Sequence, residues 1–145
     1  EEALGYCLDR IKDEEVRFHY HFDASIYVSC NGTQITQVFL NLLNNAMDAM
    51  RDSEDRELVV RGKKVGDFAD ISVCDTGAGI SKEHAKEIFE PFYSTKEKSH
   101  GMGLGLSICR ASIDEHGGEL RFENMEKGTC FVVRLPMVRG KGEEL

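Results

Sequence analysis

The chain has 145 residues, of which 41% are hydrophobic and 30% are charged, and its formal net charge is −8. This composition is typical of one globular domain that can bury a core without metal ions or disulfides. The acidic balance argues against a duplex DNA-binding protein, and no apolar run approaches the roughly 18 residues that would span a membrane. The first residues do not resemble a signal peptide, and the chain starts without Met, from which we expect a fragment of a longer protein.

The five cysteines are odd in number and show no C-x-x-C spacing. They are Cys7, Cys30, Cys74, Cys109 and Cys130. Because most of them lie in apolar runs, we expect buried free thiols in a reducing compartment rather than a disulfide or zinc framework. His19 and His21 alternate along a strand-like run and could face one metal ion, but a third ligand is missing nearby in the sequence, so a metal site is not expected there.

The first part of the chain predicts a short helix followed by a strand. Residues 2–12 have the spacing of an amphipathic helix. Its predicted buried face consists of Leu4, Leu8 and Ile11. Residues 16–22 alternate between apolar and polar side chains, which indicates a half-buried strand, and residues 26–30 can form a second short strand.

The clearest helix begins after Asn31, which can cap it, with Gln34 three residues later. Apolar residues then recur with helical spacing, so one stripe of this helix is predicted to be buried. The stripe consists of Ile35, Val38, Phe39, Leu42, Leu43, Ala46, Met47 and Met50. Directly beside it runs a polar line of Gln37, Asn41, Asn45 and Asp48. Amide oxygens suit Mg²⁺, but a solvated helix face explains the same pattern, and the helix alone leaves the two interpretations even.

The second half of the chain predicts two pairs of strands separated by helices and a loop. In chain order we expect strands over 57–65 and 67–75, a short helix over 82–88 capped by Ser81, a mobile loop over 93–103, a helix over 104–116 closed by Gly117 and Gly118, strands over 119–124 and 129–135, and a frayed tail over 139–145. Strands mixed with helices, with two local hairpins, indicate an α+β domain that has one sheet and helices on one face.

Two glycine-rich segments could bind a ligand. Asp75-Thr-Gly-Ala-Gly-Ile80 follows an apolar strand, and its glycines allow the backbone to approach a flat ligand while the carboxylate accepts from an exocyclic amine. Gly101-Met-Gly-Leu-Gly-Leu106 opens a helix whose N–H groups can hold phosphate. The second segment matches neither a P-loop nor a dinucleotide fingerprint. Taken alone, a tight turn is the better explanation of the first segment, and the second is weak support for a phosphate site.

Together and in this order, these segments resemble the sequence boxes of the nucleotide-binding catalytic domain of sensor histidine kinases. The wider superfamily includes gyrase B subunits, MutL-type repair proteins and a heat-shock chaperone. The resemblance covers residues 1–136, and its matching segments are the N box over 37–49, the G1 box over 75–80, the F box over 88–96, the G2 box over 101–107 and the pair Gly128-Thr129. It implies a two-layer α/β sandwich of the Bergerat type, with a mixed, mainly antiparallel sheet.

The resemblance also implies a role for each matching position. Asn45 becomes the Mg²⁺ ligand, Asn41 lies one turn before it near the phosphates, Asp75 accepts from the adenine amine, and Thr129 completes the adenine contact. Residues 93–103 become the ATP lid, anchored by Phe89 and Phe92. The residues implied to bind Mg-ATP are Asn41, Asn45, Asp48, Asp75, Gly77, Gly79, Ile80, Tyr93, Lys96, Gly101, Met102, Gly103, Leu104, Gly105, Leu106 and Thr129, with Asn41 and Asn45 as the catalytic pair.

Two positions depart from the family pattern. Asn41 stands where the ATP-hydrolysing branches carry a Glu that activates water, which favours a kinase over an ATPase. Asp48 stands where many histidine kinases carry a basic residue, so one phosphate contact is lost, and Asp48 can instead bind Mg²⁺-bound water or face solvent. None of the five histidines lies in the sequence context of a phosphoacceptor helix, so we expect the dimerisation domain outside this chain.

The resemblance therefore predicts a protein-histidine kinase domain. It binds Mg-ATP and donates the γ-phosphoryl group to a histidine of a separate dimerisation domain, with a response regulator downstream. We expect a cytoplasmic location, neither nucleic acid nor membrane as a partner of this domain, and leave the membrane anchoring of the parent protein open. Two alternatives remain: an ATPase switch, which the Asn41 position disfavours, and a degenerate nucleotide-binding interaction module, which the intact glycine boxes disfavour.

Overall fold

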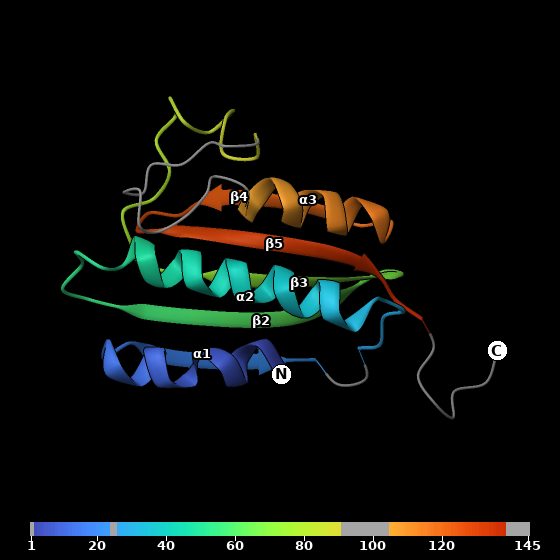
Figure 1. Cartoon of the computed structure of the whole chain (residues 1–145), viewed down its shortest axis with the longest axis horizontal. Coiled ribbons are helices and arrows are strands. Elements are labelled where there is room, and N and C mark those ends of the chain that lie inside the picture. Colours follow the sequence, from blue (N-terminus) through green and yellow to red (C-terminus); the bar gives the residue numbers. More distant parts are fainter. Residues whose placement is uncertain (1, 24–25, 91–104, 139–145) are drawn as a thin grey trace.

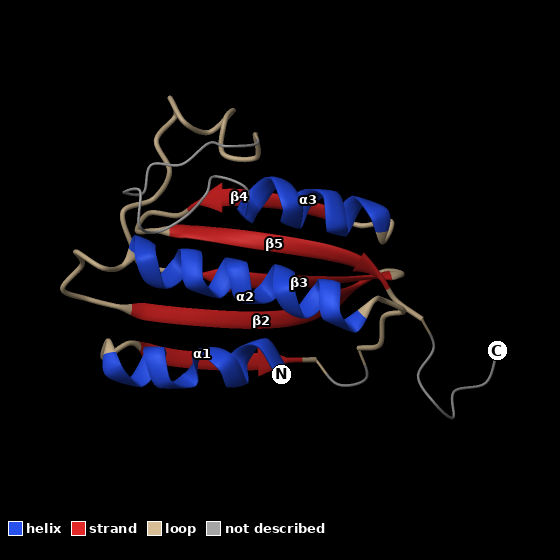
Figure 2. Ribbon diagram, viewed as in Figure 1, coloured by secondary structure: helices blue, strands red, loops and turns tan. Residues whose placement is uncertain are grey.

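The computed structural model describes residues 2–23, 26–90 and 105–138. Within these residues, three helices lie side by side on one face of a five-stranded sheet (Figure 1, Figure 2). In chain order the elements are α1 (Glu2–Asp13), β1 (Arg17–Phe22), α2 (Gly32–Ala49), β2 (Glu57–Val65), β3 (Phe68–Cys74), α3 (Gly105–Glu115), β4 (Glu119–Asn124) and β5 (Thr129–Pro136). The predicted α+β sandwich with helices on one face is confirmed.

The strands are arranged in the order β1-β2-β3-β5-β4. β1 runs parallel to β2, whereas β2 with β3, β3 with β5, and β5 with β4 are antiparallel. The sheet is therefore mixed and mainly antiparallel, as the sequence predicts. β5, the last strand of the described residues, lies between β3 and β4 and is therefore an inner strand of the sheet.

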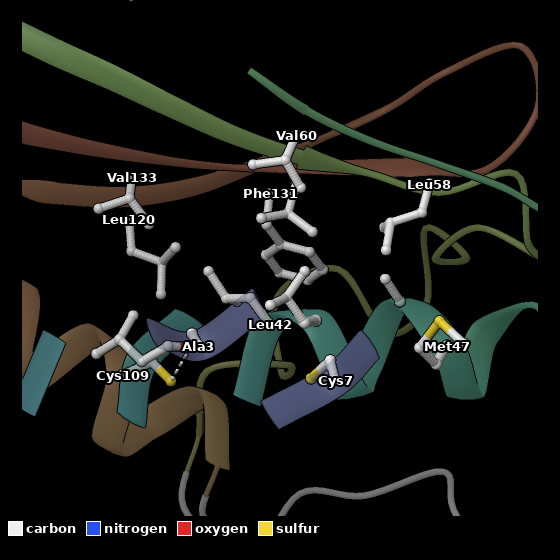
Figure 3. Close-up of a cluster of buried hydrophobic side chains, with 14 of the residues drawn as sticks. Ala3, Cys7, Leu42, Met47, Leu58, Val60, Cys109, Leu120, Phe131 and Val133 are labelled. Carbon is white, nitrogen blue, oxygen red and sulfur yellow. Dashed lines mark hydrogen bonds between the residues drawn. The ribbon is translucent and has the colours of Figure 1, made fainter. Parts of the chain in front are cut away.

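The core lies between the helices and the sheet, where Leu42 and Met47 of α2 face Val60, Phe131 and Val133 of the strands (Figure 3). The predicted stripe of α2 supplies much of this core: its fully buried members are Val38, Leu42, Leu43, Ala46, Met47 and Met50. Each of the buried Val, Leu and Met side chains contributes about 1.5–3 kcal/mol by leaving water. The amphipathic pattern thus fixes which side of α2 faces the sheet and which side carries the polar line.

The first turn of α2 is capped as predicted. The side chain of Asn31 accepts a hydrogen bond from the Gln34 N–H at 3.0 Å, and its carbonyl accepts from the Ile35 N–H at 3.0 Å. The Asn31 N–H in turn donates to Nε2 of His116, at the end of α3, at 3.0 Å. Asn31 therefore both starts α2 and links it to α3.

Three local predictions are wrong in whole or in part. α1 buries Ile11 as predicted and Leu4 packs against the core, but Leu8 is 54% exposed, because the face against α2 follows the i, i+4 series Ala3, Cys7 and Ile11. The segment over 26–30 forms an isolated bridge between Val28 and Met137 rather than a strand. Residues 82–89 form consecutive turns rather than a regular helix.

The cysteine prediction is wrong for one pair. Cys74 and Cys130 form a disulfide between β3 and β5, where they face each other in register with Cα atoms 4.0 Å apart. The sequence does not reveal this pairing because the strand register sets it across a separation of 56 residues. Cys7 and Cys109 are buried free thiols, as expected, and Cys30 is a free, exposed thiol.

Of the helices in the described ranges, none combines the length and apolar character needed to cross a bilayer. The predicted lid over 93–103 and the predicted frayed tail over 139–145 lie outside the described residues.

Candidate functional site

The ends of β3 and β5 bring Asp75 and Thr129 together at one end of the sheet. The Asp75 N–H donates to the Thr129 carbonyl at 2.9 Å, and both residues are buried, with exposed fractions of 5% and 3%. The sequence motif around Asp75 predicted an acceptor for an exocyclic amine, and the family resemblance alone added Thr129 to an adenine contact. The sheet register brings them side by side.

The Asp75 carboxylate sits in a largely dehydrated environment. Burial raises the pKa of Asp75 to about 6, while hydrogen bonds from the backbone N–H groups of Gly77 and Thr129 limit the rise. The Gly77 N–H lies 2.8 Å from Oδ1 of Asp75. A carboxylate offers about four acceptor positions, so two backbone donors leave it able to accept from an amine of a bound ligand.

The turn after Asp75 lies directly against the end of α2. A Cβ atom on Gly77 would lie 2.3 Å from the carbonyl oxygen of Ala49, and the Ala78 N–H donates to that same oxygen at 3.2 Å. Across the site, Gly128 has a φ of +85°, and a Cβ there would lie 2.0 Å from the carbonyl oxygen of Asp75. The backbone segments around Asp75 therefore approach one another more closely than any side chain would allow.

Asn124, at the end of β4, is a site residue that the sequence did not identify. Its Oδ1 accepts from the Ile80 N–H at 3.0 Å and from the Thr129 hydroxyl at 3.1 Å, and its Nδ2 donates to the Ile80 carbonyl at 2.5 Å. Asn124 thus joins the predicted residues Ile80 and Thr129. The signal that could have revealed it is the hairpin between β4 and β5, whose register pairs Asn124 with Thr129.

The amide residues of α2 line the helix edge toward α3. Nδ2 of Asn41 lies 3.5 Å from Sγ of Cys109 on α3, and Oδ1 of Asn41 accepts from Gln37 at 3.4 Å. Asn45 follows one turn later on the same side of α2. The Asn41 side chain is therefore contacted by Gln37 of its own helix and by Cys109 of α3.

Asp48 lies against α1 instead. Its carboxylate is 2.6 Å from Arg10 of α1 and 3.4 Å from Arg51, and its side chain is 17% exposed. Arg10 also donates to the side chain of Asn44 at 2.9 Å. Asp48 is therefore ion-paired rather than solvated, and the structure gives it a role in joining α1 to α2.

The segment before residue 91 is fixed by aromatic contacts. The ring of Phe89 packs against Phe122 of β4 with centroids 6.3 Å apart, and the guanidinium of Arg110 lies 4.7 Å above the Phe89 ring. Gly105 starts α3, and Leu106 packs against the core. The remaining predicted site residues, which lie outside the described ranges, are Tyr93, Lys96, Gly101, Met102, Gly103 and Leu104.

The donor set on α2 fits Mg²⁺ better than a transition metal. In the part of the chain that the structure describes, no group of three or more His, Cys, Asp and Glu side chains could hold a metal ion. Asn41 and Asn45 offer neutral amide oxygens, and Mg²⁺ in nucleotide sites keeps several waters and takes its other ligands from phosphate. Two amides on neighbouring turns therefore suit a metal that arrives with a nucleotide.

Comparison with known proteins agrees with this geometry. Residues 30–139 match the model of the family described as histidine kinase-, DNA gyrase B- and HSP90-like ATPases. The sensor protein FixL of Bradyrhizobium diazoefficiens is 38% identical over 136 residues, which are 92% of this chain and 26% of FixL. Sporulation kinase C of Bacillus subtilis is 44% identical over 105 residues, which are 72% of this chain and 24% of that kinase. The chain thus spans about a quarter of the length of these relatives.

Solved structures show the same fold. The catalytic domain of histidine kinase ThkA superposes with a TM-score of 0.83 at 34% identity, covering 93% of this chain and 89% of that domain. ThkA in complex with the response regulator protein TrrA superposes with a TM-score of 0.80 at 31% identity, covering 94% of this chain and 39% of the ThkA chain. The architecture predicted from the four sequence boxes is confirmed.

Proposed function

The chain belongs to the family of histidine kinase-, DNA gyrase B- and HSP90-like ATPases, and on this premise we propose that it is the ATP-binding catalytic domain of a sensor histidine kinase. It binds Mg-ATP and donates the γ-phosphoryl group to a histidine on a dimerisation domain. The observation that carries this proposal is the buried carboxylate of Asp75, held beside Thr129 at the end of the sheet.

Asp75 is suited to recognise adenine. With a pKa of about 6 it is ionised at neutral pH, so it accepts from the exocyclic amine of the base as a charged acceptor. The Thr129 hydroxyl donates to Asn124 and keeps its lone pairs for the ligand or a bridging water. Gly77 lets the turn after Asp75 lie against the end of α2, and Gly79 adopts a φ of +78° in the same turn.

The phosphates lie, in this proposal, between α2 and the start of α3. Asn45 would hold Mg²⁺, Asn41 lies one turn before Asn45 on the same side of α2, and the first N–H groups of α3 at Gly105 and Leu106 would face the anion. When bound, the metal neutralises charge on the phosphate oxygens. By the family resemblance, Tyr93 and Lys96 of the predicted lid over 93–103, together with the glycine-rich residues 101–104, would complete the phosphate side.

Phosphoryl transfer to an imidazole needs little help from a protein base. A ring nitrogen of the acceptor histidine attacks the γ-phosphorus with its lone pair, the bond to the bridging oxygen breaks, and ADP leaves. The chain contributes position and electrostatic stabilisation. The Asn41 amide, held by Gln37 and near Cys109, is not a base for water, which disfavours the ATPase switch of the alternative branches.

The proposal includes partners outside this chain. These are the dimerisation domain of the parent protein and a response regulator, the kind of protein that ThkA binds in its solved complex. We place the domain in the cytoplasm, where ATP and response regulators are found together.

The test is phosphotransfer in trans. The chain should bind ATP with Mg²⁺, hydrolyse it very slowly by itself, and phosphorylate a cognate dimerisation domain, giving an acid-labile and base-stable phosphohistidine. Calorimetry measures binding, and labelled ATP measures transfer. Brisk hydrolysis that Asn41→Ala does not change would favour an ATPase. Binding without any transfer would favour an interaction module.

A further inference from the structure

The Cys74–Cys130 disulfide directly adjoins the proposed adenine site. Cys74 immediately precedes Asp75, and Cys130 immediately follows Thr129. The hydrogen bond from the Asp75 N–H to the Thr129 carbonyl forms the next rung of the same ladder. The two residues proposed to contact adenine are therefore one residue away from a covalent link between their strands.

The register explains why these two thiols meet. Because Asp75 and Thr129 form a hydrogen-bonded pair, the Cys74–Cys130 pair occupies a neighbouring non-hydrogen-bonded rung, where opposed side chains are closest. Val73 and Phe131 point into the core, so the two cysteines point to the opposite face of the sheet. No helix of the described residues covers that face (Figure 2).

An external thiol can reach this pair from the open face. Cys74 is half-buried and Cys130 is buried, so Cys74 is the sulfur on which exchange starts. The other two thiols of the core behave differently, because Cys7 and Cys109 are buried under the helices and burial raises the pKa of both. The cross-strand pair is thus the reactive pair of the sheet.

We propose that Cys74 and Cys130 form a reversible redox site that regulates nucleotide affinity, an inference that rests on the proposed ATP-binding function. The oxidant class is a small-molecule disulfide. The Cys74 thiolate attacks one of its sulfurs and releases one thiol, and the Cys130 thiolate then attacks the mixed disulfide and releases the second thiol. The small disulfide is reduced, the protein dithiol is oxidised, and both thiol protons end on the released thiols.

The reducing chemistry of the proposed cytoplasmic location favours a regulatory role of this disulfide over a purely structural one. Disulfides inside a reducing compartment are rare and are usually transient or redox-sensing. In the oxidised structure Asp75, Thr129 and Asn124 are already assembled by hydrogen bonds. Reduction removes the covalent link beside the Asp75–Thr129 pair, so the nucleotide must then order this pair when it binds. The oxidised form should bind ATP about threefold to tenfold more tightly, because a preorganised site spends less ordering entropy on binding.

The experiment compares two redox states of the 145-residue chain. Cys30→Ser removes the exposed thiol and serves as the background. One sample is treated with oxidised glutathione and one with dithiothreitol. Alkylation followed by intact mass counts the free thiols, and calorimetry measures the dissociation constant for Mg-ATP. We expect two thiols fewer after oxidation and tighter binding, with no redox response of affinity after a further Cys74→Ser or Cys130→Ala substitution.

The possible failures are distinguishable. If the disulfide forms and both states bind ATP equally well, the regulatory proposal is overturned and the ATP-binding function stands. If Cys74 and Cys130 stay reduced under the oxidant, the redox site is overturned without reference to ATP. If neither state binds ATP, the proposed function fails and the regulation fails with it. Because Cys74→Ser and Cys130→Ala are tested separately, the comparison remains possible if one of the two variants fails to fold.

Discussion

At the scale of single residues, Asp75 carries the most specific prediction. Asp75→Ala should lower the affinity for ATP by about tenfold to a hundredfold, since it removes a buried acceptor and leaves the base amine unpaired at about 1–3 kcal/mol. Calorimetry measures the loss, and circular dichroism shows whether the fold survives. The matched control is Ser72→Ala, on the same strand and away from the turn. Unchanged ATP affinity in a folded Asp75→Ala variant would remove Asp75 from the site.

Asp75 should also make stability depend on pH. Burial raises its pKa from 3.8 to about 6, so between these pH values the folded chain holds a proton that the unfolded chain has lost. Stability contributed by this group is therefore present at low pH and is lost as pH rises from about 4 to about 6.

The test of this titration is Asp75→Asn, which cannot ionise. The free energy of unfolding of the variant minus that of the parent should increase by on the order of 3 kcal/mol between pH 4 and pH 7. Urea unfolding at several pH values measures the difference, and other carboxylates cancel in it. A difference that is flat with pH would mean that Asp75 titrates normally.

Gly128 provides a separate test of the close backbone approach around Asp75. Gly128→Ala should lower the free energy of unfolding by about 2–4 kcal/mol. Alanine is strained at the positive φ of this position, and its Cβ would also clash with the Asp75 carbonyl oxygen. Gly66→Ala is the control: its φ is +60° but nothing lies within 4 Å, so it should cost only about 1 kcal/mol. Equal losses of stability in the two variants would show that the contact with Asp75 adds nothing.

At the scale of elements, the cap of α2 sets the stability of the helix that carries Asn41 and Asn45. Asn31→Ala should lower the free energy of unfolding by about 1 kcal/mol, because the Gln34 N–H loses its acceptor. Asn31→Ser restores a capping oxygen and should recover most of the loss. The ATP affinity of the folded variant should stay the same, which separates a capping role from a role in the site. Chemical denaturation and calorimetry give the two readouts.

How well an element could be predicted depended on how local its determinants are. α2 follows from a cap, a helical spacing and a polar edge that all lie within 20 or so consecutive positions, so its buried face was predicted correctly. α1 is shorter, and its contact with α2 selected Cys7 over Leu8, which no local pattern distinguishes. The turns over 82–89 similarly depend on what they pack against.

The site divides in the same way. Asp75 and the glycines could be predicted because they lie in one short motif, and Thr129 could be predicted only because a family resemblance links it to that motif. Asn124 and the Cys74–Cys130 pair were missed because each depends on the register of β5 with a neighbouring strand. The ion pair between Arg10 and Asp48 could not be predicted either, because it depends on how α1 packs against α2.

At the scale of the whole molecule, the disulfide links the neighbouring strands β3 and β5 near one end of the sheet, across a sequence separation of 56 residues. Reduction should lower the free energy of unfolding by about 2–4 kcal/mol, since a closed loop of this size restricts the unfolded chain. Urea unfolding with and without dithiothreitol measures the effect. A variant with both Cys74→Ser and Cys130→Ser should show no response to dithiothreitol. If that variant responds as strongly as the parent chain, another thiol is responsible.

The position of β5 in the sheet also matters while the chain is being synthesised. β3 leaves the ribosome long before β5, and until Thr129–Pro136 follows, one edge of β3 exposes unpaired backbone groups beside the apolar residues Ile71 and Val73. The unpaired strand edge of an unfinished chain can therefore associate with other nascent chains or be bound by chaperones. The same strand brings Thr129 to Asp75, so the proposed adenine contact is assembled only when translation of the domain is almost complete.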